Sequence, residues 1–190
     1  MKRSTAAVVG ALALAATLAG CGGRDTPETA PTPPAAPTTI KAITPTTPVP
    51  APVGKPVLTL KGAVTNRNDG AAVVFDLRTL DAMATATTST HEPFVKKEMT
   101  FTGVPMADLL ARSGATTGAT KVRMHALDDY KVELPIAEFA DRRVLLATKA
   151  EGASIPIGKG GPIRLIFPAD STVGRNRDLW IWSVDSITVL

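Results

Sequence analysis

The sequence is poor in the residue types that build disulfides and metal sites, with one cysteine and two histidines among its 190 residues. The cysteine, Cys21, precedes the segment that we expect to fold, so that segment has neither a disulfide nor a thiolate ligand. His91 and His125 alone cannot supply the four Cys or His ligands of a typical structural zinc site. We therefore expect no metal site built from these residues.

The sequence also lacks a cluster of charge of one sign. The formal net charge of the chain is +4 at pH 7, but residues 57–190 contain 16 Lys or Arg and 15 Asp or Glu, which leaves +1 for that segment. Nucleic-acid binding requires a concentrated basic patch, and evenly mixed charge does not provide one. We therefore expect no nucleic-acid partner.

No apolar run is long enough to span a membrane as a helix, which takes roughly 20 residues. The longest, residues 6–19, follows Lys2 and Arg3 and has the length of a signal-peptide core. The segment Leu18-Ala19-Gly20-Cys21 resembles the lipobox of bacterial lipoproteins. The resemblance implies cleavage before Cys21 and a lipid on its thiol. Residues 1–20 are thus predicted to be a signal peptide, and the protein to be extracytoplasmic and anchored to a bacterial cell membrane. The alternative is an ordinary signal peptide with an incidental cysteine.

Residues 21–56 are predicted to be the lipid anchor followed by a disordered tether. Ten prolines and eight threonines lie between residues 24 and 56, where large apolar side chains are almost absent. Such a segment cannot bury enough surface to offset its ordering entropy. We expect it to act as a spacer between the membrane and the domain.

Residues 57–190 have the length of one ordinary domain with its own core. Short helices are expected to open near Asp76 and to run from Val104 to Arg112, with Pro105 in the first turn and Gly114 after the end. Alternating or apolar runs bounded by turn residues predict extended segments at 57–64, 85–90, 99–101, 121–125, 131–134, 144–147, 163–167, 180–182 and 186–189.

Four ordered landmarks resemble the sulfite-oxidase-type molybdopterin-binding domain family. The family has a strand-to-helix unit, a hairpin, a glycine-proline strand and a terminal strand in this order. The corresponding segments here are FTGVPMADLL (101–110), DYKVELP (129–135), LLA with EG and GPIRLIFP (145–168), and W…ITV (180–189). The resemblance implies an α+β fold, mostly β, with a mixed sheet or barrel-like arrangement. It also implies molybdopterin as the family's cofactor and oxidoreductase chemistry as its activity.

The sequence departs from the family where the chemistry would occur. Catalytic members hold molybdenum through a cysteine thiolate, whose place here is the stretch 85–90, which contains only Ala, Thr and Ser. A hydroxyl is a poor substitute for a soft thiolate. The leader has Lys2-Arg3 and no Arg-Arg pair, so it resembles a secretory signal that exports unfolded chains without a cofactor. We therefore expect no catalytic residue and no bound cofactor.

The pocket of the family fold is expected to be lined by three segments: 85–91, 128–130 and 158–164. Hydroxyl, imidazole, cationic and backbone donors in these segments suit a small anion. Each has a structural alternative, since threonines favour strands and glycines favour turns. The candidate ligand-binding residues are Thr87, Thr88, His91, Asp129, Tyr130, Lys159, Gly160, Gly161 and Arg164.

Three functions are compatible with these features. The first is a lipid-anchored, non-catalytic module that binds a small anionic ligand or a protein partner. The second is a molybdopterin-dependent oxidoreductase, or a subunit of one, with unusual metal ligation. The third is a structural envelope lipoprotein in which the tether matters more than the pocket.

Overall fold

The structure is a computed structural model that describes residues 48–190. The predicted signal peptide, the lipid site at Cys21 and most of the predicted tether lie outside the described residues. Within 48–190, no helix combines the length and apolar character needed to cross a membrane.

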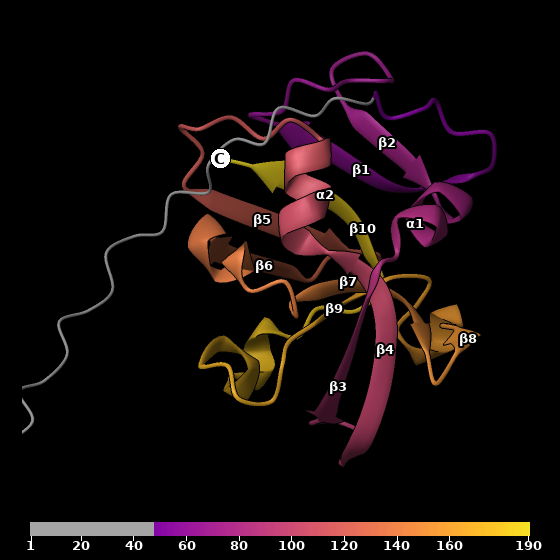
Figure 1. The fold of residues 1–190 in the computed structure, drawn as a ribbon, viewed down its shortest axis with the longest axis vertical. Helices are drawn as coiled ribbons and strands as arrows, with labels where there is room; N and C mark the ends of the chain where they lie inside the picture. The colour runs from indigo at the N-terminus through magenta and orange to yellow at the C-terminus, as the bar shows by residue number, and fades with distance from the viewer. Residues whose placement is uncertain (1–47) are drawn as a thin grey trace, which may run out of the picture. The chain divides into compact units, whose positions relative to one another are not determined.

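The first sheet has five strands in the order β2-β1-β10-β5-β6 (Figure 1). The first and last strands of the domain, β1 and β10, are neighbours in the interior of this sheet and pair in parallel. All other neighbouring strands in the sheet pair antiparallel. The predicted hairpin is confirmed, because β5 and β6 pair across the turn at residues 127–130. The strands are β1 (Pro56–Gly62), β2 (Val73–Asp76), β5 (Lys121–Ala126), β6 (Lys131–Pro135) and β10 (Val184–Val189).

The second sheet has the order β3-β4-β7-β8, and β9 pairs with β7. The long β3–β4 hairpin extends away from the first sheet in Figure 1. The mostly β, mixed-sheet prediction is confirmed, whereas the barrel-like arrangement is not, since the sheets of residues 48–190 do not close. The strands are β3 (Ala86–Glu92), β4 (Lys97–Pro105), β7 (Leu145–Ala150), β8 (Ala153–Ser154) and β9 (Arg164–Ile166).

Two short α-helices occur where the sequence predicted them. The carboxylate of Asp76 caps α1 (Leu77–Met83) by accepting a hydrogen bond from the Thr79 amide. Pro105 precedes α2 (Met106–Arg112), and Gly114 follows it with φ of +68°. The 3₁₀ turns are η1 (Ile136–Ala140), η2 (Ile157–Lys159), η3 (Val173–Arg175) and η4 (Arg177–Leu179).

Residues 48–56, which the sequence analysis places in the tether, contact the domain. The side chain of Val49 is 5% exposed and joins the core. The amides of Val53 and Gly54 donate to Asp76. Hydrogen bonds from Thr79 and from these two amides hold the pKa of the Asp76 carboxyl well below its usual range. The chain therefore packs against the domain before β1 begins.

The prediction of a strand at residues 180–182 is wrong. This segment is irregular, and its two tryptophans have different surroundings. Trp180 packs edge-on against Phe167 and donates its indole N–H to the carbonyl of Gly174. Trp182 instead packs against Phe94 and beneath the guanidinium of Arg164. Because the two indole rings have different surroundings, the alternation expected of a strand does not hold in this segment.

Candidate functional site

The stretch expected to face the family's pocket forms β3, and its residues alternate between two faces. Thr88 is buried and donates its hydroxyl to the carbonyl of Arg143 at 2.8 Å. Thr87 and His91 are exposed on the opposite face. Thr87 shares a hydrogen bond with Thr102, and the His91 ring lies 3.4 Å from Glu98. Of these three candidates, only Thr88 points into the fold.

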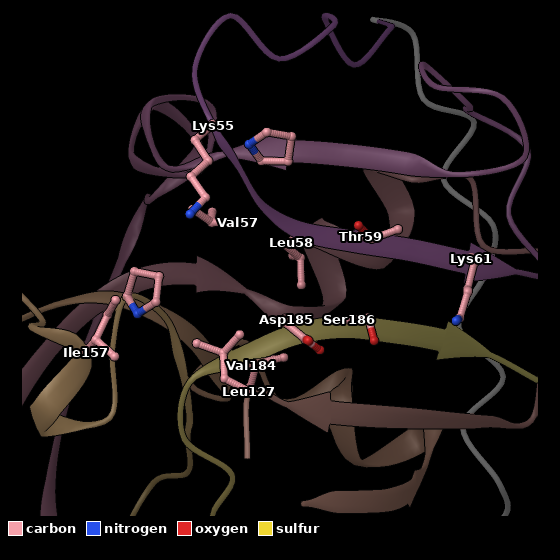
Figure 2. Close-up of a pocket in the computed structure, with 12 residues that line it drawn as sticks. Lys55, Val57, Leu58, Thr59, Lys61, Leu127, Ile157, Val184, Asp185 and Ser186 are labelled. Atoms are coloured by element: carbon pink, nitrogen blue, oxygen red, sulfur yellow. The ribbon is translucent and has the colours of Figure 1, made fainter. Parts of the chain in front are cut away.

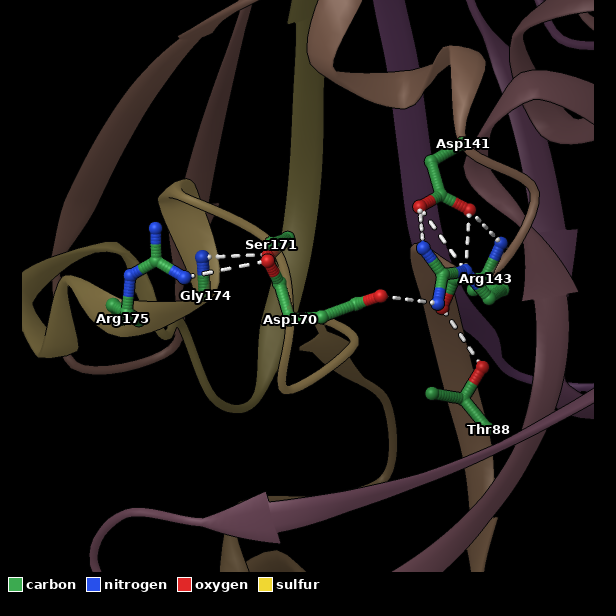
Figure 3. A network of polar contacts seen from close by, with 7 residues as sticks. All are labelled: Thr88, Asp141, Arg143, Asp170, Ser171, Gly174 and Arg175. Carbon is green, nitrogen blue, oxygen red and sulfur yellow. Dashed lines mark hydrogen bonds and ion pairs between the residues drawn. The ribbon is translucent and has the colours of Figure 1, made fainter. Parts of the chain in front are cut away.

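A small cavity of about 290 Å³ lies between β3 and the loop after β9, and Thr87, Thr88 and Arg143 are among its lining residues. The guanidinium of Arg143 is held by two carboxylates (Figure 3). The carboxylate of Asp141 accepts a hydrogen bond from Nη2 of Arg143 at 2.8 Å, and that of Asp170 accepts one from Nη1 at 3.0 Å. These contacts raise the pKa of Arg143, and Arg143 lowers the pKa of Asp141. The group carries one positive and two negative charges, so it has no cationic capacity left for an anion.

Molybdopterin, which the sequence resemblance implies, does not fit this donor set. The side chains that β3 offers to this cavity are hydroxyls, whereas the sequence resemblance implies a thiolate ligand for molybdenum. A phosphate-bearing cofactor would also meet the net negative charge of the Arg143, Asp141 and Asp170 group. Residues 48–190 contain no cluster of three His, Cys, Asp or Glu side chains arranged to hold a metal.

A second, larger cavity of about 630 Å³ lies beside β4, β7 and β8 and brings Lys159 and Arg164 together. Arg164 is buried, with a side-chain exposure of 4%, and its Nη2 donates to Glu92 at 2.6 Å. Burial lowers the pKa of the Arg164 guanidinium, and the pairing with Glu92 opposes this shift. The guanidinium also stacks 4.3 Å above the Trp182 ring. Arg164 is therefore a fixed buried cation at the wall of this cavity.

Gly160 and Gly161 lie beside this cavity, where their role is to allow close packing of the loop. Their amides donate to the carbonyls of Ile157 and Pro156, so neither amide is free for an anion, contrary to our expectation. A Cβ at Gly160 would lie 2.9 Å from the Trp182 ring, and one at Gly161 would lie 1.9 Å from the carbonyl oxygen of Ile155. Both glycines allow the loop to pass close to its neighbours.

A third cavity, of about 600 Å³, lies where β1 and β10 begin (Figure 2). The side chains of Leu127 and Ile157, both more than half exposed, approach its mouth. Its charged residues are Lys55, Lys61 and Asp185. None of the nine candidate residues lines this cavity.

Asp129 and Tyr130 lie in the β5–β6 turn and line none of these three cavities. The backbone of Asp129 is in the left-handed region, with φ of +66°. Its carboxylate accepts a hydrogen bond from Nε2 of His125 at 3.1 Å. The hydroxyl of Tyr130 donates to the carbonyl of Asp178 at 2.7 Å. The three predicted segments therefore do not surround one common cavity within residues 48–190.

His125 should make the stability of the domain dependent on pH. Both ring nitrogens contact carboxylates, Asp185 at 2.8 Å and Asp129 at 3.1 Å, and these contacts raise the pKa of the imidazole above its ordinary value near 6.5. The stabilisation is complete below the unfolded-state pKa and is lost as pH rises through the higher folded-state pKa. Thermal melts of the protein and of His125→Gln should therefore differ more at pH 5.5 than at pH 8.5. An equal difference at both pH values would contradict this assignment.

Several residues at these sites were not predicted from the sequence. Glu92 and Trp182 complete the surroundings of Arg164 although they are distant from it in the chain. Arg143 is anchored by a neighbour, Asp141, and by the distant Asp170. The short spacing from Asp141 to Arg143 is the only local signal among these contacts.

Comparisons with known proteins agree with this fold. The family model described as the oxidoreductase molybdopterin-binding domain matches residues 76–184. The crystal structure of the sulfane dehydrogenase SoxCD from Paracoccus pantotrophus is similar in fold, with a TM-score of 0.55 and 20% sequence identity. The similarity covers 70% of this chain but only 37% of that one. No curated protein matches the sequence. Because the family model covers more than half of the chain, this protein belongs to the oxidoreductase molybdopterin-binding domain family.

Proposed function

We propose that this protein is a lipid-anchored, extracytoplasmic module of the molybdopterin-binding fold that binds a small anionic ligand or a protein partner and carries out no redox reaction. One observation carries the proposal. The strand expected to present the metal thiolate instead presents Thr88, whose hydroxyl is committed to the carbonyl of Arg143. The neighbouring cation is already neutralised by Asp141 and Asp170.

The leader supports the proposal from a different direction. Its lipobox-like segment ends at Cys21, and its basic residues are Lys2-Arg3 without an arginine pair. A secretory leader of this kind delivers an unfolded chain, which cannot carry a cofactor assembled in the cytoplasm. A tether rich in proline would then hold the domain away from the membrane.

Molybdenum and pterin content decides between this function and the main alternative. Protein purified from membranes with its own leader is expected to contain neither. The measurements are elemental analysis by mass spectrometry and fluorescence of the oxidised pterin. About one molybdenum per chain would overturn the non-catalytic assignment.

The lipid anchor is tested by Cys21→Ser, which removes the lipid site and should move the folded protein from the membrane fraction to the soluble fraction. A Cys21→Ser protein that stays with membranes would overturn the anchor.

The alternative is a molybdopterin-dependent oxidoreductase or a subunit of one. The match of residues 76–184 to the family model favours it. Such an enzyme would need unusual metal ligation, because the 85–90 stretch has no cysteine. The same elemental analysis tests this alternative directly.

A further inference from the structure

The edge strand β3 has backbone hydrogen-bonding groups without a partner among residues 48–190. It is the outermost strand of the second sheet, with β4 on one side only. The amide and carbonyl of Thr100 in β4 face away from β3, because they bond the carboxylate and the amide of Glu151. Thr100 is the β4 partner of Ser89, so the two form a non-hydrogen-bonded pair of the ladder. The backbone N–H and C=O of Ser89 therefore point outward from the sheet.

The same geometry repeats two residues to either side of Ser89. Thr87 and His91 occupy pairs of the same kind, because the two kinds of pair alternate along an antiparallel ladder. Side chains approach most closely in non-hydrogen-bonded pairs. The hydroxyl oxygens of Thr87 and Thr102 lie 3.2 Å apart, and those of Ser89 and Thr100 lie 3.0 Å apart, as this arrangement requires. Each of the three β3 residues thus presents one N–H and one C=O at the edge.

The edge strands β2, β6 and β8 differ from β3, since each is covered, charged or short. In β2, the side-chain amide of Asn68 bonds both the amide and the carbonyl of Val74. The exposed positions of β6 include Lys131 and Glu133, and β8 has only two residues. β3 runs for seven residues, and its exposed side chains are two hydroxyls and an imidazole. It lacks the charges, prolines and covering groups by which edge strands avoid pairing with another strand.

Open space lies beside this edge. The cavity of about 290 Å³ between β3 and the loop after β9 is lined by Thr87, Thr88 and Ser89. Alternation places Thr88 on one face of β3 and its two neighbours on the other, so a cavity that touches all three runs along the edge of the strand. Residues 168–170 of the loop line its far side. The loop therefore leaves the edge of β3 open to an added strand.

We propose that a second copy of this chain pairs with β3, strand against strand and antiparallel. The pattern of outward groups is self-complementary about Ser89. In this register Ser89 lies opposite Ser89 of the other copy, and Thr87 lies opposite His91, so every outward N–H and C=O of both strands finds a partner. No like charges meet, because His91 faces a threonine. This inference rests on the proposed function, whose protein partner it names. Lipid anchors in one membrane would raise the local concentration of the two copies, which suits a contact of modest area.

Sedimentation equilibrium of the mature chain from residue 21, with Cys21→Ser to remove the lipid site, tests the proposal. At about 100 µM this protein should be a dimer. Ser89→Pro removes an outward N–H and no hydrogen bond within residues 48–190, so it should fold normally by circular dichroism and dimerise at least about tenfold more weakly. A chain that is monomeric at this concentration, or a folded Ser89→Pro protein that dimerises as tightly as its parent, would overturn a second copy as the occupant of the edge.

Charge variants test the register without altering the backbone. Ser89→Lys and Ser89→Asp each bring like charges together across the two-fold axis, so each should dimerise about threefold to fivefold more weakly than the parent. An equimolar mixture should associate more tightly than either variant alone, because opposite charges then meet. Ser154→Lys, at an exposed serine of β8, is the matched control and should dimerise like the parent. Equal weakening by Ser154→Lys, or no gain on mixing, would overturn pairing at β3.

The result is independent of the molybdenum measurement. A dimer through β3 in protein that contains molybdenum would overturn the non-catalytic assignment and leave this interface in place. A monomer in protein that contains no molybdenum would overturn the interface and leave the non-catalytic assignment.

Discussion

Replacing Arg164 by methionine is expected to lower the free energy of unfolding by about 3–5 kcal/mol. Methionine approximates the volume of the arginine stem but leaves the Glu92 carboxylate, with 0% side-chain exposure, as an unpaired buried charge. Chemical denaturation monitored by tryptophan fluorescence measures the loss. Lys121→Met is the matched control, because it breaks an exposed pair with Glu133 and should cost less than about 1 kcal/mol.

The double variant Arg164→Met with Glu92→Gln distinguishes a lost ion pair from lost packing. Removing both charges should recover most of the stability that Arg164→Met loses, because no uncompensated charge remains. Additive losses from the two substitutions would mean that the packing of Arg164 between Phe101 and Trp182 matters more than its charge.

Replacing Gly103 by alanine is expected to destabilise the domain by about 1–3 kcal/mol or more. A Cβ at this position would lie 2.3 Å from the carbonyl oxygen of Leu146 and 2.6 Å from the Cα of Ala147. Both contacts are backbone atoms of β7, so β4 would have to separate from its partner strand where the register already shifts. Thermal and denaturant unfolding measure the effect.

Gly118→Ala is the control for this substitution. Its Cβ would meet nothing within 4 Å, and its φ is not in the left-handed region, so the change should stay within about 0.5 kcal/mol. A Gly103→Ala protein as stable as Gly118→Ala would contradict the close approach of β4 and β7.

Local patterns predicted the elements whose contacts are local. The β5–β6 hairpin follows from alternation on both sides of a short turn, and α1 follows from the capping position of Asp76. The four-residue β2 was not predicted, since all its side chains are buried and its run is too short to show a period. Sequence patterning therefore predicted the β5–β6 hairpin and the cap of α1 but missed β2.

The candidate site could be predicted only in part, because its contacts are long-range. Arg164 and Lys159 were identified as cations near a glycine loop, and they line one cavity. The Arg164–Glu92 pair joins residues 72 positions apart, which no local pattern indicates. Thr87 and Thr88 are neighbours in sequence, yet the alternation of β3 exposes one and buries the other.

The parallel pairing of β1 with β10 has a consequence for how the chain acquires its structure. Residues 59–62 take their partners from residues 186–189, so the centre of the first sheet joins the two ends of the domain. A chain that is delivered from its N-terminus, by a ribosome or through a membrane pore, must wait for β10 before this pair can form. Until then one edge of β1 stays open to wrong partners. The centre of the first sheet can therefore be completed only after the last strand of the domain has been delivered.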